Sequence, residues 1–314
     1  MNASVFSGSA AVAYAAFNLR DDYYREMARE VVAAARRANA SSVPRAIDLG
    51  AGIGISTMEV IAATPGLRRM LAVEPEEGMR AFAELNVMGD PRVAVVAGRG
   101  EKLAEAVPAD LRGQVDLLTC CQAFHLFNPP GKDSLVPALL AEAAQVMGAG
   151  GIFAFDLGPS NYAFALPLAD HRAGSAKSGQ IETELSHPLY QRVQAILLEE
   201  VRKDYPAFDR SDLWPAAGAR QDFAGLEERF AAAGFTQFRC SEVLVPVPGR
   251  RVIEFIRNGW AVFFRWPPLV ELDMEVKLGL MRRAIGRLLA EGELDRLSGL
   301  ISYHPTAVFT AVRG

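Results

Sequence analysis

The sequence predicts an α/β protein built around a doubly wound, mostly parallel sheet of seven strands. In the first half of the chain, short apolar runs alternate with stretches rich in helix-forming residues, as in a series of strand–helix units. The runs are apolar at nearly every position, which is typical of parallel strands that helices cover on both faces. Two more apolar runs stand near the C-terminus, the first of them directly after an amphipathic helix.

The elements follow in a regular order up to residue 158. Five strands are expected, at residues 45–50, 69–75, 92–98, 115–124 and 151–158. Four helices are expected from composition and from helix start and stop signals, at residues 21–39, 56–64, 77–87 and 137–148. Ligands of such sheets bind beyond the carboxyl ends of the strands, so the loops there are the first places to search for a site.

The second half of the chain is less regular. A helix is expected at 222–235, strands at 236–245 and 305–314, and a largely helical stretch between the two strands. Residues 159–220 carry Pro, Gly, Ser and His without periodicity. We therefore expect an N-terminal helical segment at 1–40, a core at 41–158, an insertion or lid at 159–220, and the C-terminal part of the core sheet at 221–314 with a helical insertion at about 249–300.

The composition is that of an ordinary globular protein and bounds the class of partner. The 314 residues are 50% hydrophobic and 22% charged, with a formal net charge of −4. Nucleic-acid affinity comes mainly from Lys and Arg, and the sequence has no basic stripe, so no nucleic-acid partner is expected. No membrane segment is expected either, because the N-terminus lacks a signal-like leader and the apolar stretch at 252–270 is interrupted by charged residues.

The cysteines and histidines predict neither a metal site nor a disulfide framework. Cys120, Cys121 and Cys240 form no C-x-x-C pair, and the four histidines show no ligand spacing with them. Without a secretory context, a reduced, cytoplasmic protein is expected. The sequence does not fix the assembly, and a homodimer stays open.

A glycine-rich loop follows the first strand, in the stretch "RAIDLGAGIGIST" at 45–57. A dinucleotide loop of the form G-x-G-x-x-G would need glycine at 55 or 57, where Ile55 and Thr57 stand. No G-K-[ST] follows, so a phosphate-binding P-loop is absent as well. The loop is therefore expected to make room for a ligand other than a pyrophosphate, or else to be a turn that needs positive φ.

An acid at the end of the second strand adds to this loop. Glu74 stands 20 residues after Gly54, and a carboxylate there can accept hydrogen bonds from both ribose hydroxyls of a nucleoside lying over the glycines. The alternative is a solvated acid in an acidic turn, since Glu76 and Glu77 lie beside it. The occurrence of loop and acid together favours the nucleoside.

Four motifs together resemble a known family. "AIDLGAGIGIST", "LAVEPEEGM", "VAGRGEKL" and "VDLLTCCQAFHLFN", in this order and spacing, resemble class I S-adenosylmethionine-dependent methyltransferases, in the branch with an AFHWF-like motif after the fourth strand. The resemblance covers about residues 5 to 158, and "AAAGFTQF" before the sixth strand extends it. It implies a Rossmann-like methyltransferase fold with a helical cap from the insertions, S-adenosyl-L-methionine as cofactor, and an N-terminal segment that covers the cofactor.

The resemblance also implies the residues of the cofactor site. Gly50, Ala51 and Gly52 would let the backbone approach the methionine moiety, with Asp48 beneath the loop. Glu74 would bind the ribose. The remaining implied contacts are Tyr14, Met79, Gly100, Glu101, Gln122 and Ala123.

One position departs from the family. Where the family usually has "GDAE", this chain has "GRGE" at 98–101, so that Arg99 replaces an acid that often contacts the adenine amino group. Backbone groups of Gly100, or Glu101, are expected to serve instead.

The acceptor side is less well defined. His125 follows the fourth strand, and its ordinary pKa suits proton removal near neutrality, so it is the candidate general base. The alternative is a histidine that only shapes the cofactor pocket, since many methyl transfers need no base. With His125, the candidate substrate pocket contains Tyr162, Trp260 and Phe264, although aromatic residues at helical spacing are also typical of a core.

The expected function is methyl transfer from S-adenosylmethionine, in line, to O, N or C of a small-molecule acceptor. Two alternatives stay open. One is a methyltransferase-fold protein that binds S-adenosylmethionine but catalyses a non-methylation reaction, for which Arg99 is the only support in the sequence. The other is an NAD(P)-dependent oxidoreductase, which the missing third glycine disfavours.

Overall fold

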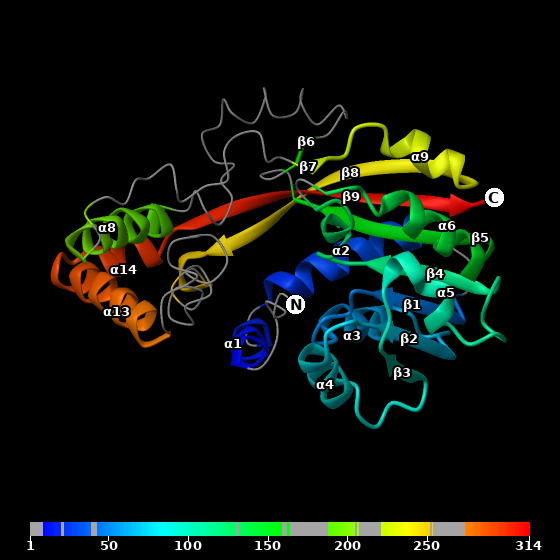
Figure 1. Ribbon diagram of the computed structural model, residues 1–314, viewed down its shortest axis with the longest axis horizontal. Helices are drawn as coiled ribbons and strands as arrows, with labels where there is room; N and C mark the ends of the chain where they lie inside the picture. The colour runs from blue at the N-terminus through cyan, green and yellow to red at the C-terminus, as the bar shows by residue number, and fades with distance from the viewer. Residues whose placement is uncertain are drawn as a thin grey trace. The chain divides into compact units, whose positions relative to one another are not determined.

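The fold is taken from a computed structural model (Figure 1). It describes residues 9–19, 22–38, 43–129, 132–158, 162–163, 188–204, 206, 221–251, 253 and 274–314. The chain divides into two compact units. Unit 1 comprises Met1–Leu166, Gln221–Val243 and Thr306–Gly314, and unit 2 comprises Pro167–Arg220 and Leu244–Pro305.

Unit 1 is organised around the predicted sheet, which has seven strands in the order β3-β2-β1-β4-β5-β9-β8. The strands are β1 (Arg45–Leu49), β2 (Arg69–Val73), β3 (Val93–Val96), β4 (Val115–Cys120), β5 (Met147–Leu157), β8 (Phe235–Pro248) and β9 (Ile301–Arg313). Strands β1 to β5 pair in parallel, and β9 pairs antiparallel to β5. The expectation of a doubly wound, mostly parallel seven-stranded sheet is confirmed.

Several strand boundaries differ from the expected ones, among them one end each of β4 and β5. β5 begins at Met147 and not at 151, and β4 ends at Cys120 and not at 124. The residues after Cys120 form a turn in which Gln122 has a positive φ of 52°, followed by a 3-10 helix η2 (Phe124–Phe127). An apolar run shows which residues are buried, but it does not show where the backbone leaves the sheet.

Helices cover the sheet in the manner of a doubly wound fold (Figure 1). α2 (Tyr23–Ala38) packs against α3 (Ile55–Ala63) and β5, and the two helices share a buried cluster that includes Val31, Val60 and Ile152. Arg25 and Arg29 of α2 also pair with Glu59 of α3, at 3.5 and 2.9 Å. In a second group, α6 (Val136–Val146) packs against η1 (Gly100–Lys102), α5 (Leu103–Ala106) and α9 (Leu226–Ala232).

The N-terminal helix α1 (Ser9–Asn18) packs against α4 (Glu77–Asn86). Its small residues Ala11 and Ala15 are buried together with Ile53, Ile55 and Met79. The helix therefore rests on the segment that follows β1, where the glycine-rich loop lies.

A group of phenylalanines fills the core between β5, β9 and α9. The ring of Phe155 stacks on Phe124, Phe230 and Phe309 at centroid distances of 4.0, 5.4 and 4.8 Å. These side chains are fully buried. Phe124 belongs to η2, so the 3-10 helix after β4 is fixed to the core by its first residue.

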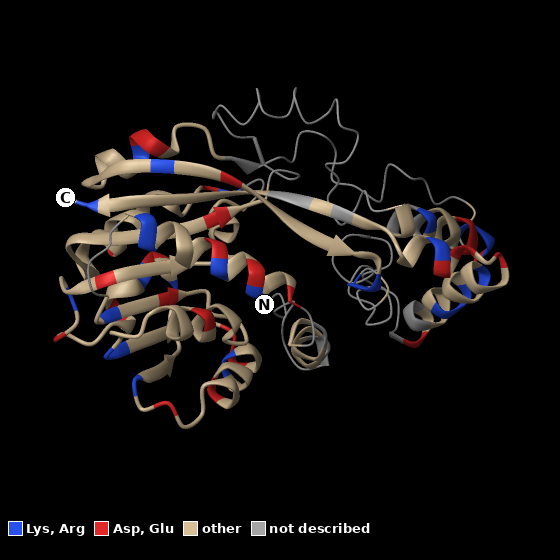
Figure 2. Cartoon of the chain, turned by 180° about the vertical axis from the view of Figure 1, so that it is seen from behind, with Lys and Arg blue, Asp and Glu red and all other residues tan. Residues whose placement is uncertain are grey.

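Unit 2 contains helices α8 (Pro188–Asp204), α13 (Met274–Ala290) and α14 (Glu293–Ser298), and α8 packs against the other two. Figure 2 shows basic and acidic residues mixed on these helices. Glu200, buried on α8, pairs with Arg283 and Arg287 of α13 at 3.1 and 3.4 Å. α13 and α14 lie within the range predicted to be largely helical.

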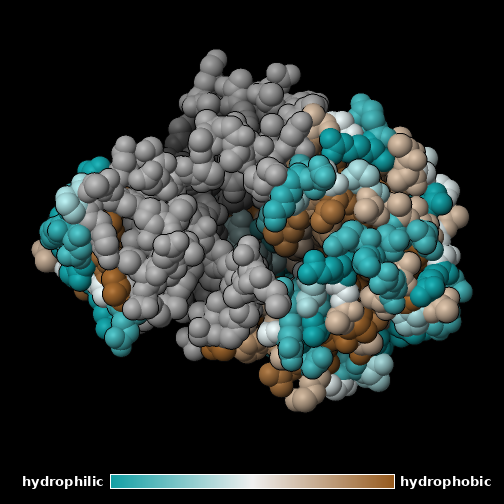
Figure 3. All heavy atoms as spheres, in the orientation of Figure 1, coloured by the Kyte–Doolittle hydropathy of each residue, from teal (hydrophilic) through white to brown (hydrophobic). Residues whose placement is uncertain are grey.

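The surface of the described residues is mixed in character. Figure 3 shows hydrophobic residues scattered among hydrophilic ones on the visible face of unit 1, as on most globular proteins. Within the described residues, no helix is long and apolar enough to cross a membrane. In that same part of the chain, no group of three or more His, Cys, Asp or Glu could hold a metal ion.

Candidate functional site

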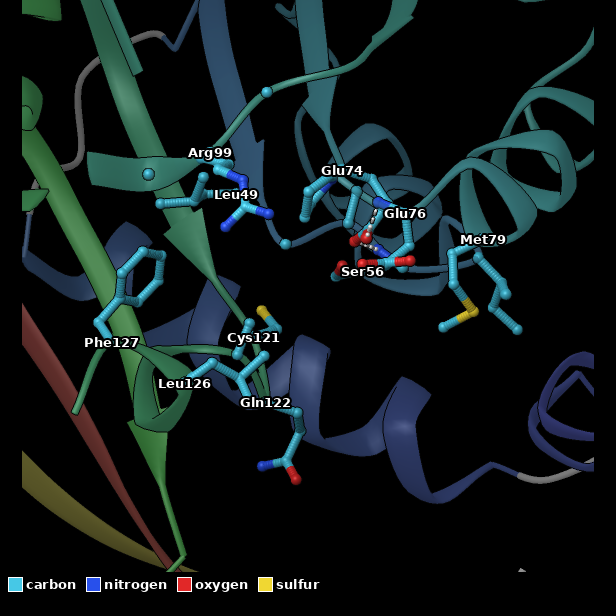
Figure 4. A pocket seen from close by; sticks show the side chains of 18 of the residues that line it. Leu49, Ser56, Glu74, Glu76, Met79, Arg99, Cys121, Gln122, Leu126 and Phe127 are labelled. Atoms are coloured by element: carbon cyan, nitrogen blue, oxygen red, sulfur yellow. Dashed lines mark hydrogen bonds between the residues drawn. The ribbon is translucent and has the colours of Figure 1, made fainter. Parts of the chain in front are cut away.

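Unit 1 has a cavity of about 470 Å³ at the carboxyl ends of β1, β2 and β4 (Figure 4). The loops that follow these strands and β3 make most of its wall, and helices α1, α2, α3 and α4 contribute further residues. The lining residues are Tyr14, Tyr24, Leu49–Ile53, Ile55, Ser56, Glu74–Glu76, Met79, Gly98–Glu101, Cys121–Ala123, Leu126, Phe127 and Leu135. The site thus lies where ligands bind in open parallel sheets.

The glycine-rich loop adopts a backbone that only glycine takes readily. Gly50, Gly52 and Gly54 have φ values of 69°, 56° and 86°. A Cβ on Gly50 would lie 2.5 Å from Cβ of Ala123, whereas the nearest atom to a Cβ on Gly52 is Met79 Cε, 3.7 Å away. Gly50 therefore makes room for another part of the protein, whereas a Cβ on Gly52 would make only an ordinary van der Waals contact at the cavity wall.

Asp48 lies beneath this loop, fully buried and not on the cavity wall. Its Oδ2 accepts hydrogen bonds from Ser56 Oγ (2.6 Å) and Thr57 Oγ1 (2.7 Å), and its Oδ1 accepts one from Thr119 Oγ1 (2.8 Å). Burial raises the pKa of Asp48, and the three hydroxyl donors act against that rise. The carboxylate thereby joins β1 to the first turn of α3 and to β4, which fixes both ends of the loop.

Glu74 is held at the cavity wall by two backbone N–H groups (Figure 4). Gly52 N donates to Oε2 and Glu76 N donates to Oε1, both at 2.9 Å. The residue is 7% exposed, so it is not a solvated acid of the acidic turn. Burial raises the pKa of Glu74, and the two N–H donors oppose this effect.

The segment after β3 forms another part of the wall. Arg99 extends from it with 67% of its side chain exposed and lies 3.7 Å from Glu101. Gly100 is packed closely, because a Cβ there would lie 2.5 Å from the ring of Phe127. Glycine is required at position 100 because the Phe127 ring lies so close to it, and not because of its backbone dihedral angles.

The turn after β4, which we call the post-β4 turn (Cys121–Ala123), borders the cavity opposite the segment after β2. Gln122 N donates to Asp156 Oδ1 at 2.6 Å, and Gln122 Nε2 donates to Asp156 Oδ2. Asp156 lies on β5 and is fully buried. Burial raises the pKa of Asp156 from 3.8 to about 7, against the effect of the Gln122 donors.

This pKa shift predicts the pH dependence of stability. Between pH 3.8 and about 7 the folded protein holds a proton on Asp156 that the unfolded chain has released, so the stabilisation from this proton is lost as pH rises. We expect the free energy of unfolding of wild type, relative to Asp156→Asn, to fall as pH rises through this range and then to level off. Urea unfolding of both proteins at several pH values measures the difference, in which contributions from other groups cancel. A difference that does not vary with pH would contradict it.

Ten of the predicted site residues line the cavity: Tyr14, Gly50, Ala51, Gly52, Glu74, Met79, Gly100, Glu101, Gln122 and Ala123. Asp48 lies beneath it. His125 is in η2, half-buried, and is not among the lining residues. Tyr162 is in β6 (Tyr162–Ala163), of which only the backbone is described. Trp260 and Phe264 lie outside the described residues.

Sequence reasoning did not place several residues at the site. The side chains of Leu126 and Leu135 line the cavity although both residues are partly exposed, and no signal in the sequence distinguishes them from other apolar residues. For Asp156 the sequence gives only a weak indication of a role near the site, because it is an acid near the end of an otherwise apolar strand.

Residues 47–155 match the sequence pattern of a family described as methyltransferase domain. No curated protein matches the chain in sequence. The chain is similar to the solved structure of the YcgJ protein from Bacillus subtilis, with 15% identity and a TM-score of 0.47, over 90% of this chain and 97% of that chain. It is also similar to phosphoethanolamine N-methyltransferase 2 from Haemonchus contortus in complex with S-adenosylhomocysteine, with 14% identity and a TM-score of 0.43, over 90% of this chain and 52% of that chain. A third similar structure is geranyl diphosphate C-methyltransferase from Streptomyces coelicolor, also with S-adenosylhomocysteine, with 10% identity and a TM-score of 0.41, over 90% of this chain and 78% of that chain.

Proposed function

We propose that the cavity at the ends of β1, β2 and β4 binds S-adenosylmethionine, and that a small molecule accepts the methyl group. Residues 47–155 match the pattern of a methyltransferase domain, which supports this proposal. The observation that carries this proposal is the Glu74 carboxylate, fixed by Gly52 N–H at the cavity wall. A carboxylate held in this way keeps lone pairs for a ribose diol.

The glycine loop supports the same assignment. The space beside Gly52 lets an amino-acid chain approach the backbone, and the fixed loop leaves little to reorganise on binding. We assign Gly50, Ala51 and Gly52 to the methionine moiety, Glu74 to the ribose, and Met79, Gly100 and Glu101 to the base. Tyr14 and the post-β4 turn complete the wall at which the sulfonium end would lie.

S-adenosylmethionine supplies an electrophilic methyl group on a positively charged sulfur. The task of the protein is then to align an acceptor atom behind the carbon–sulfur bond and to exclude water, which together lower the barrier by several kcal/mol. His125 follows the post-β4 turn and is the candidate base for an acceptor that must lose a proton.

A small acceptor agrees with the charge of the chain. A net charge of −4 gives no electrostatic attraction to a nucleic-acid backbone, and the cavity of about 470 Å³, within the range for small-molecule sites, is assigned to the cofactor itself. Calorimetry with S-adenosylmethionine and S-adenosylhomocysteine tests the cofactor site, and formation of S-adenosylhomocysteine with a panel of small amines, phenols and carbon nucleophiles tests the reaction. Binding of neither nucleoside would refute the proposal.

Arg99 is expected to contribute little to cofactor affinity. Its side chain is mostly exposed and its ion pair with Glu101 is long, and such pairs contribute about 0–1 kcal/mol. We expect Arg99→Ala to change the dissociation constant of S-adenosylhomocysteine by less than about fivefold. A much larger loss, measured by calorimetry, would show that the guanidinium binds the cofactor directly.

A further inference from the structure

We propose that Asp156 is a positioning residue of this site: it holds the post-β4 turn in the conformation that completes the cavity wall. The proposal rests on the proposed function, since the wall in question belongs to the cofactor cavity. Asp156 itself does not line the cavity and acts through Gln122.

The turn is in a conformation that it would not adopt readily by itself. Gln122 has φ at 52°, in the left-handed region, where a residue with a Cβ is disfavoured. Glutamine lacks the short side chain by which Asn and Asp stabilise this region locally. Something outside the turn must therefore maintain it.

Asp156 supplies the required contacts from a rigid support. Its strand pairs with β4 on one side and with β9 on the other, where Asp156 is in register with Val308. From this position the carboxylate accepts both the backbone N–H and the side-chain amide of Gln122. A buried carboxyl group is costly unless its oxygens are hydrogen-bonded, so Asp156 and the turn stabilise each other.

The consequence for the cavity follows from the next residue. Ala123 lies against Gly50, so close that a Cβ on Gly50 would be 2.5 Å from Cβ of Ala123. The post-β4 turn and the glycine loop thus meet directly, and a displaced turn changes the cavity at both. In Figure 4 the Gln122 side chain extends away from Glu74, so Asp156 and Glu74 fix separate parts of the wall.

Three variants test this role. Asp156→Ala removes both contacts, while Asp156→Asn keeps an oxygen that can accept the Gln122 N–H. Gln122→Gly, combined with Asp156→Ala, removes the need for support, because glycine takes positive φ without a steric penalty. The matched control is Asp116→Ala, since Asp116 also accepts a backbone N–H and a guanidinium, from Arg45, but at the opposite end of β4.

Two readouts are measured on each protein: the dissociation constant of S-adenosylhomocysteine, and the amide hydrogen exchange of residues 121–127. For Asp156→Ala we expect affinity to fall by at least about tenfold and exchange to become faster. Asp156→Asn should lose less, Gln122→Gly should restore part of the affinity lost by Asp156→Ala, and Asp116→Ala should change neither readout.

Wild-type affinity and unchanged exchange in Asp156→Ala would overturn the inference, as would an equal loss in Asp116→Ala. If Asp156→Ala does not fold, Asp156→Asn alone decides, by the same two readouts. If wild type does not bind S-adenosylhomocysteine, the proposed function fails, but hydrogen exchange still shows whether Asp156 holds the turn.

Discussion

Glu74→Gln should lower the affinity for S-adenosylhomocysteine by about 10- to 150-fold, because it removes a charged hydrogen-bond acceptor worth about 1.5–3 kcal/mol. The two Glu74 oxygens accept N–H groups from Gly52 and Glu76. An amide can replace only one of these acceptors and would place a donor against the other N–H. Calorimetry measures the loss directly.

The control for this variant is Glu77→Gln. Glu77 is an exposed acid at the start of α4 and does not line the cavity. Both variants remove one negative charge within four residues of each other, so a general electrostatic effect would appear in both. Equal affinities in Glu77→Gln and Glu74→Gln would contradict the assignment of Glu74 to the ribose.

The fold was predictable because the pattern that identifies it is local. In β1, β2 and β5, apolar side chains are needed at nearly every position, since helices lie on both faces of these strands. The turn at Gln122 was not predictable, because its conformation depends on Asp156, 34 residues further along the chain. The long strand β5 likewise begins within "MGAGG", where glycines give no strand signal.

The site was predictable where one loop or one strand end carries the chemistry. The glycines and Glu74 lie next to β1 and β2 in sequence, so their spacing alone brings them together at the sheet edge. The positive φ of the loop glycines agrees with an expectation from the sequence, but the close packing of two glycines was not predictable: a Cβ on Gly50 would meet Ala123, and one on Gly100 would meet Phe127. Such contacts depend on how β3 and β4 are placed by the rest of the fold. Trp260 and Phe264 stay predictions.

The glycine loop provides a further test, because Gly50 and Gly52 have similar backbone angles but different surroundings. Gly50→Ala should destabilise the protein by about 2–5 kcal/mol, from the cost of a positive φ and from overpacking against Ala123. Gly52→Ala should cost only the first of these, about 1–2 kcal/mol. Urea unfolding of the two variants measures both losses.

Affinity should separate the same two positions. A methyl group on Gly52 enters the cavity, where S-adenosylhomocysteine is expected to approach the backbone, so Gly52→Ala should lower affinity by about tenfold or more while the protein stays folded. The matched control is Gly50→Ala combined with Ala123→Gly, which removes the clash within the protein and keeps the same backbone cost. That pair should recover most of the stability lost by Gly50→Ala. If Gly52→Ala bound the nucleoside as tightly as wild type, the part of the cavity beside Gly52 would not be where the cofactor lies, and the methionine moiety would have to be placed elsewhere in the cavity.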